Sequence, residues 1–133
     1  MGVAASAAMR SAETSVPIVD GSVLSELQTL GREAVTEIFD LFLADAPSRL
    51  VKLQHAIDDR SLDLVLREAH GLKGSALGIG ASRLASLCAA IEHDAREGHL
   101  DRARARSSQL EPRFAEVRTA LDDLRAGIRA AQA

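Results

Sequence analysis

The chain has 133 residues, of which 47% are hydrophobic, 26% are charged and 2% are aromatic, and its formal net charge is -3. This length and composition are typical of one soluble globular domain with its own core. The negative charge and the scarcity of aromatic side chains argue against nucleic-acid binding, which uses basic surfaces and stacking aromatics. The single cysteine, Cys88, excludes an internal disulfide, and its place on an apolar helical stripe predicts a buried packing residue.

Residues 1–18 form the first predicted segment. They are rich in Ala and Ser, and Arg10 is their only basic residue, so they do not have the charged start and long apolar core of a signal peptide. We expect a flexible tail or linker here and a folded domain over residues 19–130. No apolar run reaches the roughly 18 residues that a membrane span needs, so a cytoplasmic protein is expected.

From Asp20 onward, apolar residues recur at the three- and four-residue spacing of helices. A short helix capped by Asp20 or Ser22 is expected to end at Gly31. The next helix covers residues 32–45, and Pro47 is expected to kink it or to begin a new helix.

The second half of the chain shows the same helical spacing. One helix is expected to begin after Ser61 and to end at Gly78 and Gly80, and the next one ends at Gly98. The last helix is predicted to be the longest, with a bend at Pro112 near its first third. These elements predict an all-α fold, an up-down antiparallel four-helix bundle with a short extra N-terminal helix.

The candidate functional site lies in residues 69–81, AHGLKGSALGIGA. On a helix, His70, Lys73, Gly74 and Leu77 share one face, at the edge of the buried stripe, so His70 is expected to be at least partly exposed. Neutral histidine is nucleophilic, Lys73 would offset the charge of a bound phosphoryl group, and Gly74 would leave room beside it. The residues alone leave open a second interpretation, in which His70 is structural and the glycines mark a close helix crossing.

The run HGLKGS at residues 70–75, followed by Gly80-Ala81, resembles the signature of histidine-containing phosphotransfer (HPt) domains, His-x-Leu-Lys-Gly-Ser and then Gly-Ala. The similarity covers roughly residues 20–127, including the segments at 39–47 and 84–92. It implies a four-helix bundle in which His70 takes a phosphoryl group from, or gives it to, a receiver-domain aspartate. The domain would then be a relay without autonomous kinase activity. No intrinsic cofactor is expected, because the receiver would bring Mg²⁺.

One position departs from the family pattern. Many members place a glutamine on the following helix, where it hydrogen-bonds the histidine, and by spacing the corresponding residue here is Glu92. A glutamate would orient neutral His70 through its N–H but would repel a phosphoryl group, so Glu92 either points elsewhere or changes this detail. Arg96, one turn further, is either an added cation for the site or a surface partner of Glu92.

The expected partner is a receiver domain of a response regulator or a hybrid histidine kinase. Leu77, Ala81 and Leu43 are candidates for the docking patch, together with Glu92 and Arg96. No nucleic acid is expected, because the basic run at residues 102–106 is interpreted as a solvated helix face. No direct membrane contact is expected either, and the isolated domain should be monomeric. The cytoplasmic location would also hold for the C-terminal domain of a membrane-anchored sensor kinase.

Two other functions compete with phosphotransfer. A docking module would bind the receiver without transfer, and an enzyme acting on a small molecule would need a concave pocket with several converging polar groups. His55, His93 and His99 are expected to be surface residues without a metal, because their spacing does not match a metal site.

Overall fold

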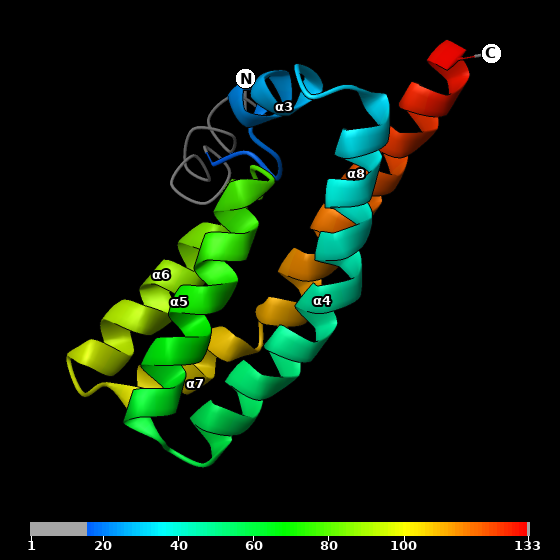
Figure 1. The fold of residues 1–133 in the computed structure, drawn as a ribbon. Helices are drawn as coiled ribbons and strands as arrows, with labels where there is room; N and C mark the ends of the chain where they lie inside the picture. The colour runs from blue at the N-terminus through cyan, green and yellow to red at the C-terminus, as the bar shows by residue number, and fades with distance from the viewer. Residues whose placement is uncertain (1–15, 133) are drawn as a thin grey trace, which may run out of the picture.

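The computed structural model describes residues 16–132, which form six α-helices and no β-strand (Figure 1). The predicted all-α class is confirmed for this part of the chain. Most of the expected N-terminal tail, residues 1–15, lies outside the described residues. The helices are α3 (Gly21–Gln28), α4 (Arg32–Asp58), α5 (Leu62–Gly78), α6 (Ser82–Arg96), α7 (Leu100–Ser107) and α8 (Leu110–Gln132).

The four long helices α4, α5, α6 and α8 share one apolar core. Helix α5 packs against α4 and α6, and both of these also contact α8 (Figure 1). Because each helix buries one stripe of side chains, the polar faces remain in solvent. The largest fully buried side chains are Phe39, Leu53, Ile57, Val65, Leu72, Leu84, Cys88, Ile91, Val117 and Leu121. Burial raises the pKa of the Cys88 thiol to about 12, so this predicted packing residue stays neutral.

Helix α3 lies at the end of the bundle where α5 joins α6 (Figure 1). The backbone N–H of Asp20 donates to the carbonyl oxygen of Gly80 at 2.6 Å. Gly80 has a φ of +75°, and a Cβ there would lie 3.0 Å from Cβ of Val23. The glycine of the Gly80-Ala81 pair is thus required by the turn and by the close approach of α3.

The helix ends follow some of the predicted caps. Asp20 caps α3, since its side chain accepts a hydrogen bond from the Ser22 N–H at 2.9 Å. Gly31 precedes α4 with a φ of +94° instead of ending α3 directly. Ser61 precedes α5 as expected, but its side chain makes no capping hydrogen bond. Residues 16–18 were assigned to the tail, yet the Arg83 N–H donates to the carbonyl of Pro17 at 3.1 Å.

Of the two outcomes expected at Pro47, the start of a new helix is wrong, because α4 continues through it from Arg32 to Asp58. A proline cannot donate the hydrogen bond to the carbonyl four residues earlier. Ala46 and Leu50 on either side of it are buried, and this packing keeps the chain helical. The resulting helix has 27 residues and exceeds α8, which has 23, so the last helix is not the longest.

The expected single last helix is two helices, α7 and α8. The Ser107 and Ser108 hydroxyls at the junction donate to the carbonyls of Arg104 and Ala105, which competes with continued helix. Pro112 lies in the first turn of α8, where no backbone N–H is needed, so it begins a helix and does not bend one. Part of the basic run is also not simply solvated, because Arg106 pairs with buried Asp94.

Candidate phosphotransfer site

His70 lies in the middle of α5 with its imidazole largely in solvent. Its neighbours Ala69 and Leu72 are fully buried, so the helix is fixed against the core on their side. The His70 side chain, on the outer side, is 71% exposed. The prediction that it stands at the edge of the buried face is confirmed, and the imidazole is accessible to another protein.

Glu92 of α6 points directly at His70 and Lys73. One carboxylate oxygen, Oε2, lies 3.2 Å from Nδ1 of His70, and the other, Oε1, lies 2.6 Å from Nζ of Lys73. Glu92 itself is only 6% exposed, since the contact between α5 and α6 encloses it. Of the two orientations that the sequence left open, the structure has the one in which the glutamate takes part in the site.

The charge state of Glu92 determines the tautomer of His70. The hydrogen bond from Lys73 holds the pKa of Glu92 below its ordinary value of 4.5, burial opposes this, and the bond with His70 adds to it. The carboxylate is therefore an anion at neutral pH and only accepts hydrogen bonds. Nδ1 of His70 must carry the hydrogen, so the lone pair of the neutral ring is on Nε2.

Lys73 and Arg96 supply the two cations beside His70. Lys73 was predicted to face a phosphoryl group, but in this structure it is bound to Glu92 and is only 25% exposed. Arg96 places Nη2 3.3 Å from Oε2 of Glu92. This is the i,i+4 pair of the second interpretation, and it also brings a second positive charge to the same carboxylate.

Gly74 and Gly71 differ in their surroundings although both lie next to His70. A Cβ built on Gly74 would have no neighbouring atom within 4 Å, so this position opens to solvent. A Cβ on Gly71 would lie 3.0 Å from Nη1 of Arg49 on α4. A side chain at Gly71 would thus meet only the end of a flexible arginine, and nothing in the described chain requires Gly74 to lack a side chain.

A shallow apolar groove follows α4 and α5 next to Gly74. Leu41 of α4, which lines it, is 70% exposed, and the predicted docking residue Leu77 of α5 is 53% exposed but does not line it. Of the other expected docking residues, Ala81 is fully buried and Leu43 packs against the core. Leu41 was missed, although an apolar residue off the α4 stripe was a usable signal. The groove, of about 470 Å³, is lined by Ile38, Leu41, Phe42 and Asp45 of α4 and by Gly74, Ser75, Gly78 and Ile79 at the end of α5.

A model of the Hpt domain family matches residues 37–127 of the chain. The crystal structure of histidine-containing phosphotransfer protein B (HptB) from Pseudomonas aeruginosa PAO1 is similar, with a TM-score of 0.78 and 34% sequence identity. That match covers 83% of this chain and 96% of HptB. The chain belongs to the Hpt family. No curated protein matches it significantly.

The function of this Hpt domain is phosphotransfer in a phosphorelay, and Hpt domains interact with receiver domains in such relays. Two of the signature residues, His70 and Gly74, lie on the exposed side of α5, where another protein has access. The six-residue run at 70–75 therefore contains both a residue that packs the core and residues that face solvent. Leu72 is a core residue, whereas His70 and Gly74 face outward.

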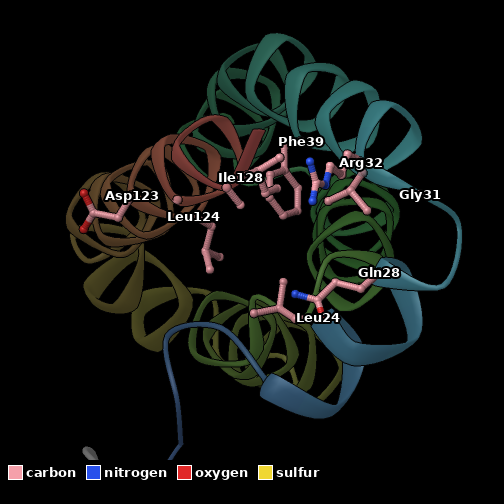
Figure 2. Close-up of a pocket in the computed structure, with 11 residues that line it drawn as sticks. Leu24, Gln28, Gly31, Arg32, Phe39, Asp123, Leu124 and Ile128 are labelled. Atoms are coloured by element: carbon pink, nitrogen blue, oxygen red, sulfur yellow. The ribbon is translucent and has the colours of Figure 1, made fainter. Parts of the chain in front are cut away.

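A cavity of about 570 Å³ lies at the end of the Hpt domain that carries α3. Figure 2 shows Leu24 of α3, Phe39 of α4 and Leu124 and Ile128 of α8 around it. None of the predicted site residues lines this cavity. Its walls are mostly apolar, and Gln28, Arg32 and Asp123 supply the polar side chains.

The remaining histidines of the Hpt domain, His55, His93 and His99, are exposed, as predicted. Within residues 16–132, no three His, Cys, Asp or Glu side chains come together in a way that could hold a metal ion. A helix long and apolar enough to cross a membrane is not found in the described part of the chain.

The lowered pKa of Glu92 predicts an acid-sensitive contribution to stability. The folded Hpt domain holds this carboxylate deprotonated more strongly than the unfolded chain does. The resulting stabilisation is fully present above about pH 4.5 and is lost as the pH falls through the lowered pKa. In urea unfolding between about pH 7 and pH 3, the free energy of unfolding of the wild type should fall more steeply in acid than that of Glu92→Gln. If the free energy of unfolding fell equally with pH in the two proteins, the ion pair of Glu92 with Lys73 would contribute nothing to stability.

Proposed function

We propose that His70 carries the phosphoryl group of this Hpt domain, receiving it from and passing it to receiver-domain aspartates. The observation that carries the proposal is the contact of Glu92 with Nδ1, at 3.2 Å, on an imidazole whose side chain is 71% exposed. This contact fixes the hydrogen on Nδ1 and leaves the lone pair on Nε2, away from Glu92. An exposed, nucleophilic nitrogen with a defined tautomer is what an attack on an external phosphoryl group requires.

The transfer is a displacement at phosphorus. The lone pair of His70 Nε2 attacks the phosphorus of an aspartyl phosphate, the bond from phosphorus to the aspartate oxygen breaks, and the carboxylate leaves. The reverse step returns the electron pair to Nε2. Lys73 offsets part of the charge on the transferred group, and Gly74 leaves the space through which it approaches. Mg²⁺ bound to the receiver would neutralise phosphoryl oxygens, so this chain needs no metal of its own.

The receiver is proposed to dock over α4 and α5 around His70. The exposed leucines at positions 41 and 77 and the groove beside Gly74 offer an apolar contact surface. Arg96, 62% exposed, lies at the edge of the site, where it can meet acidic groups of a receiver. We further propose a monomeric relay domain without kinase activity, in the cytoplasm, either free or as the C-terminal part of a sensor kinase.

We also propose that α4, α5, α6 and α8 follow an up-down order. The connections Asp59–Ser61 and Ile79–Ala81 are short, which favours antiparallel neighbours. Helix α7 occupies the longer connection between α6 and α8. This order places α6, with Glu92, along the same side of α5 as His70 and Lys73.

The test of the function is transfer from a phosphorylated receiver domain, followed by mapping of the modified residue. The chain should gain a label that is lost in acid and kept in base, and it should map to the peptide containing His70. The other three histidines, all exposed, serve as internal controls in the same digest. Binding of the receiver without any label would support a docking module, and a label on another residue would refute the assignment to His70.

A further inference from the structure

We propose that Glu92 is a positioning residue that holds the cations of the site while His70 is unmodified and shortens the lifetime of the phosphohistidine. This inference rests on the proposed function of His70. Position 92 carries a buried carboxylate. The uncharged amide of a glutamine could accept the same hydrogen bond from Nδ1 without adding a negative charge. In this way the domain would release a phosphoryl group readily and would not store it.

The contacts of Glu92 use the whole carboxylate. Lys73 binds one oxygen at 2.6 Å, and His70 and Arg96 share the other at 3.2 and 3.3 Å. Glu92 is 6% exposed and the Lys73 side chain 25%, so water screens this pair less than the contacts of Glu92 with the exposed His70 and Arg96. Before phosphorylation, the two positive charges are therefore balanced in part by a fixed negative charge.

Phosphorylation of Nε2 changes this balance. The group brings about two negative charges to the far side of the ring from Glu92. The positive charges of Lys73 and Arg96 must then neutralise two anions, and the carboxylate and the phosphoryl group repel each other. With glutamine at position 92, the same two cations would neutralise the phosphoryl group alone. The carboxylate thus raises the free energy of the phosphorylated form relative to the unmodified one.

The hydrogen bond between Glu92 and Nδ1 also favours release, because it speeds the departure of the phosphoryl group from Nε2. When an acceptor oxygen attacks the phosphorus, the nitrogen–phosphorus bond breaks and its electron pair returns to Nε2. Because Glu92 keeps the hydrogen on Nδ1, the ring leaves as neutral imidazole and no further proton is required. An imidazole that had lost this hydrogen would leave as an anion, which is a much poorer leaving group.

The pH dependence of release gives a readout that a merely structural role would not change. The groups that face Glu92 are His70 and Lys73 from α5 and Arg96 and Cys88 from α6. In the described chain, α7 and α8 place no hydrogen-bond or ion-pair partner on it. The Cys88 thiol, with a pKa of about 12, stays neutral between about pH 6 and pH 9. The Nδ1 hydrogen, which Glu92 holds at 3.2 Å, is the part of this cluster on which release of the phosphoryl group depends.

The test compares the decay of phosphohistidine in the wild type and in Glu92→Gln. Both proteins are loaded with phosphoramidate, a small donor that does not depend on receiver docking, and decay is followed by ³¹P NMR between about pH 6 and pH 9. We expect a half-life about tenfold longer in the variant at neutral pH. The decay of the variant should also slow at a lower pH than that of the wild type. Glu111→Gln, which removes an exposed glutamate of α8, should decay like the wild type.

A second variant covers the case in which Glu92→Gln folds poorly. Arg96→Gln removes a 62% exposed cation, keeps Glu92 and should shorten the half-life, because one positive charge fewer opposes the two anions. Equal half-lives and pH profiles in labelled wild type and Glu92→Gln would overturn the inference, as would a longer half-life in Arg96→Gln. Failure of the proposed function would look different, since the wild type would then not be labelled on His70 at all.

Discussion

Replacing His70 by glutamine abolishes phosphoryl transfer and leaves the fold intact. Glutamine keeps a polar side chain of similar length that can still donate a hydrogen bond to Glu92, but its amide nitrogen has no lone pair available for attack. We expect labelling by a phosphorylated receiver to fall at least about 100-fold, since the lost group is the nucleophile itself. Because the His70 side chain is 71% exposed, the free energy of unfolding should change by no more than about 0.5 kcal/mol.

The matched control for this experiment is His93→Gln. His93 is an exposed histidine on α6, and it is not among the groups that contact Glu92. Its variant should discharge a phosphorylated receiver at the wild-type rate. Transfer by His70→Gln at a comparable rate would move the acceptor to another residue and would also remove the basis for a role of Glu92.

Replacing Gly74 by glutamine blocks transfer through crowding and not through unfolding. The position is open, with no atom within 4 Å of a built Cβ, so the isolated domain accepts the side chain. Glutamine is a better helix former than glycine by about 0.5–1 kcal/mol, so thermal stability should rise slightly. The new side chain occupies the space next to His70 through which the receiver approaches. A displacement of about 1 Å at a reacting centre costs about 100-fold in rate, which is the loss we expect in receiver-dependent transfer.

Two comparisons separate crowding from other causes. Gly127→Gln is the matched control, because Gly127 also lies within a helix with no atom near a built Cβ, on α8. It should gain similar helix stability and keep full transfer. Labelling of Gly74→Gln by phosphoramidate should be reduced much less than labelling by the receiver, since the small donor needs less space. Wild-type transfer from the receiver in Gly74→Gln would show that no partner comes close to this position.

The helical periodicity and the motif were sufficient to predict which site residues share a helix face and which are buried. The three- and four-residue spacing predicted that Leu72 is buried and that His70 lies at the edge of that stripe, and both hold in the structure. Helical spacing also put His70, Lys73 and Gly74 on one face. These are properties of a single helix, so the residues within one segment are sufficient to predict them.

The docking surface and the long helices were predicted less well. Leu41 lies in the first half of α4 and contributes to the groove only because α4 and α5 are adjacent. Ala81 looked available from its position in the motif, but α3 and the turn at Gly80 bury it. Pro47 does not begin a new helix and Pro112 does not lie in the middle of one, because core packing and position within the first turn decided the two outcomes.

The sequence by itself determined the helical class, the exposed His70 on α5 and the neighbouring cation Lys73, because each depends on spacing within one helix. Only the tertiary structure decided what Glu92 does. Glu92 and His70 are 22 residues apart, and their meeting depends on how α6 is rotated against α5. That rotation is set by the buried side chains between the two helices, and it is the reason that Lys73 is bound to a carboxylate and not free beside His70.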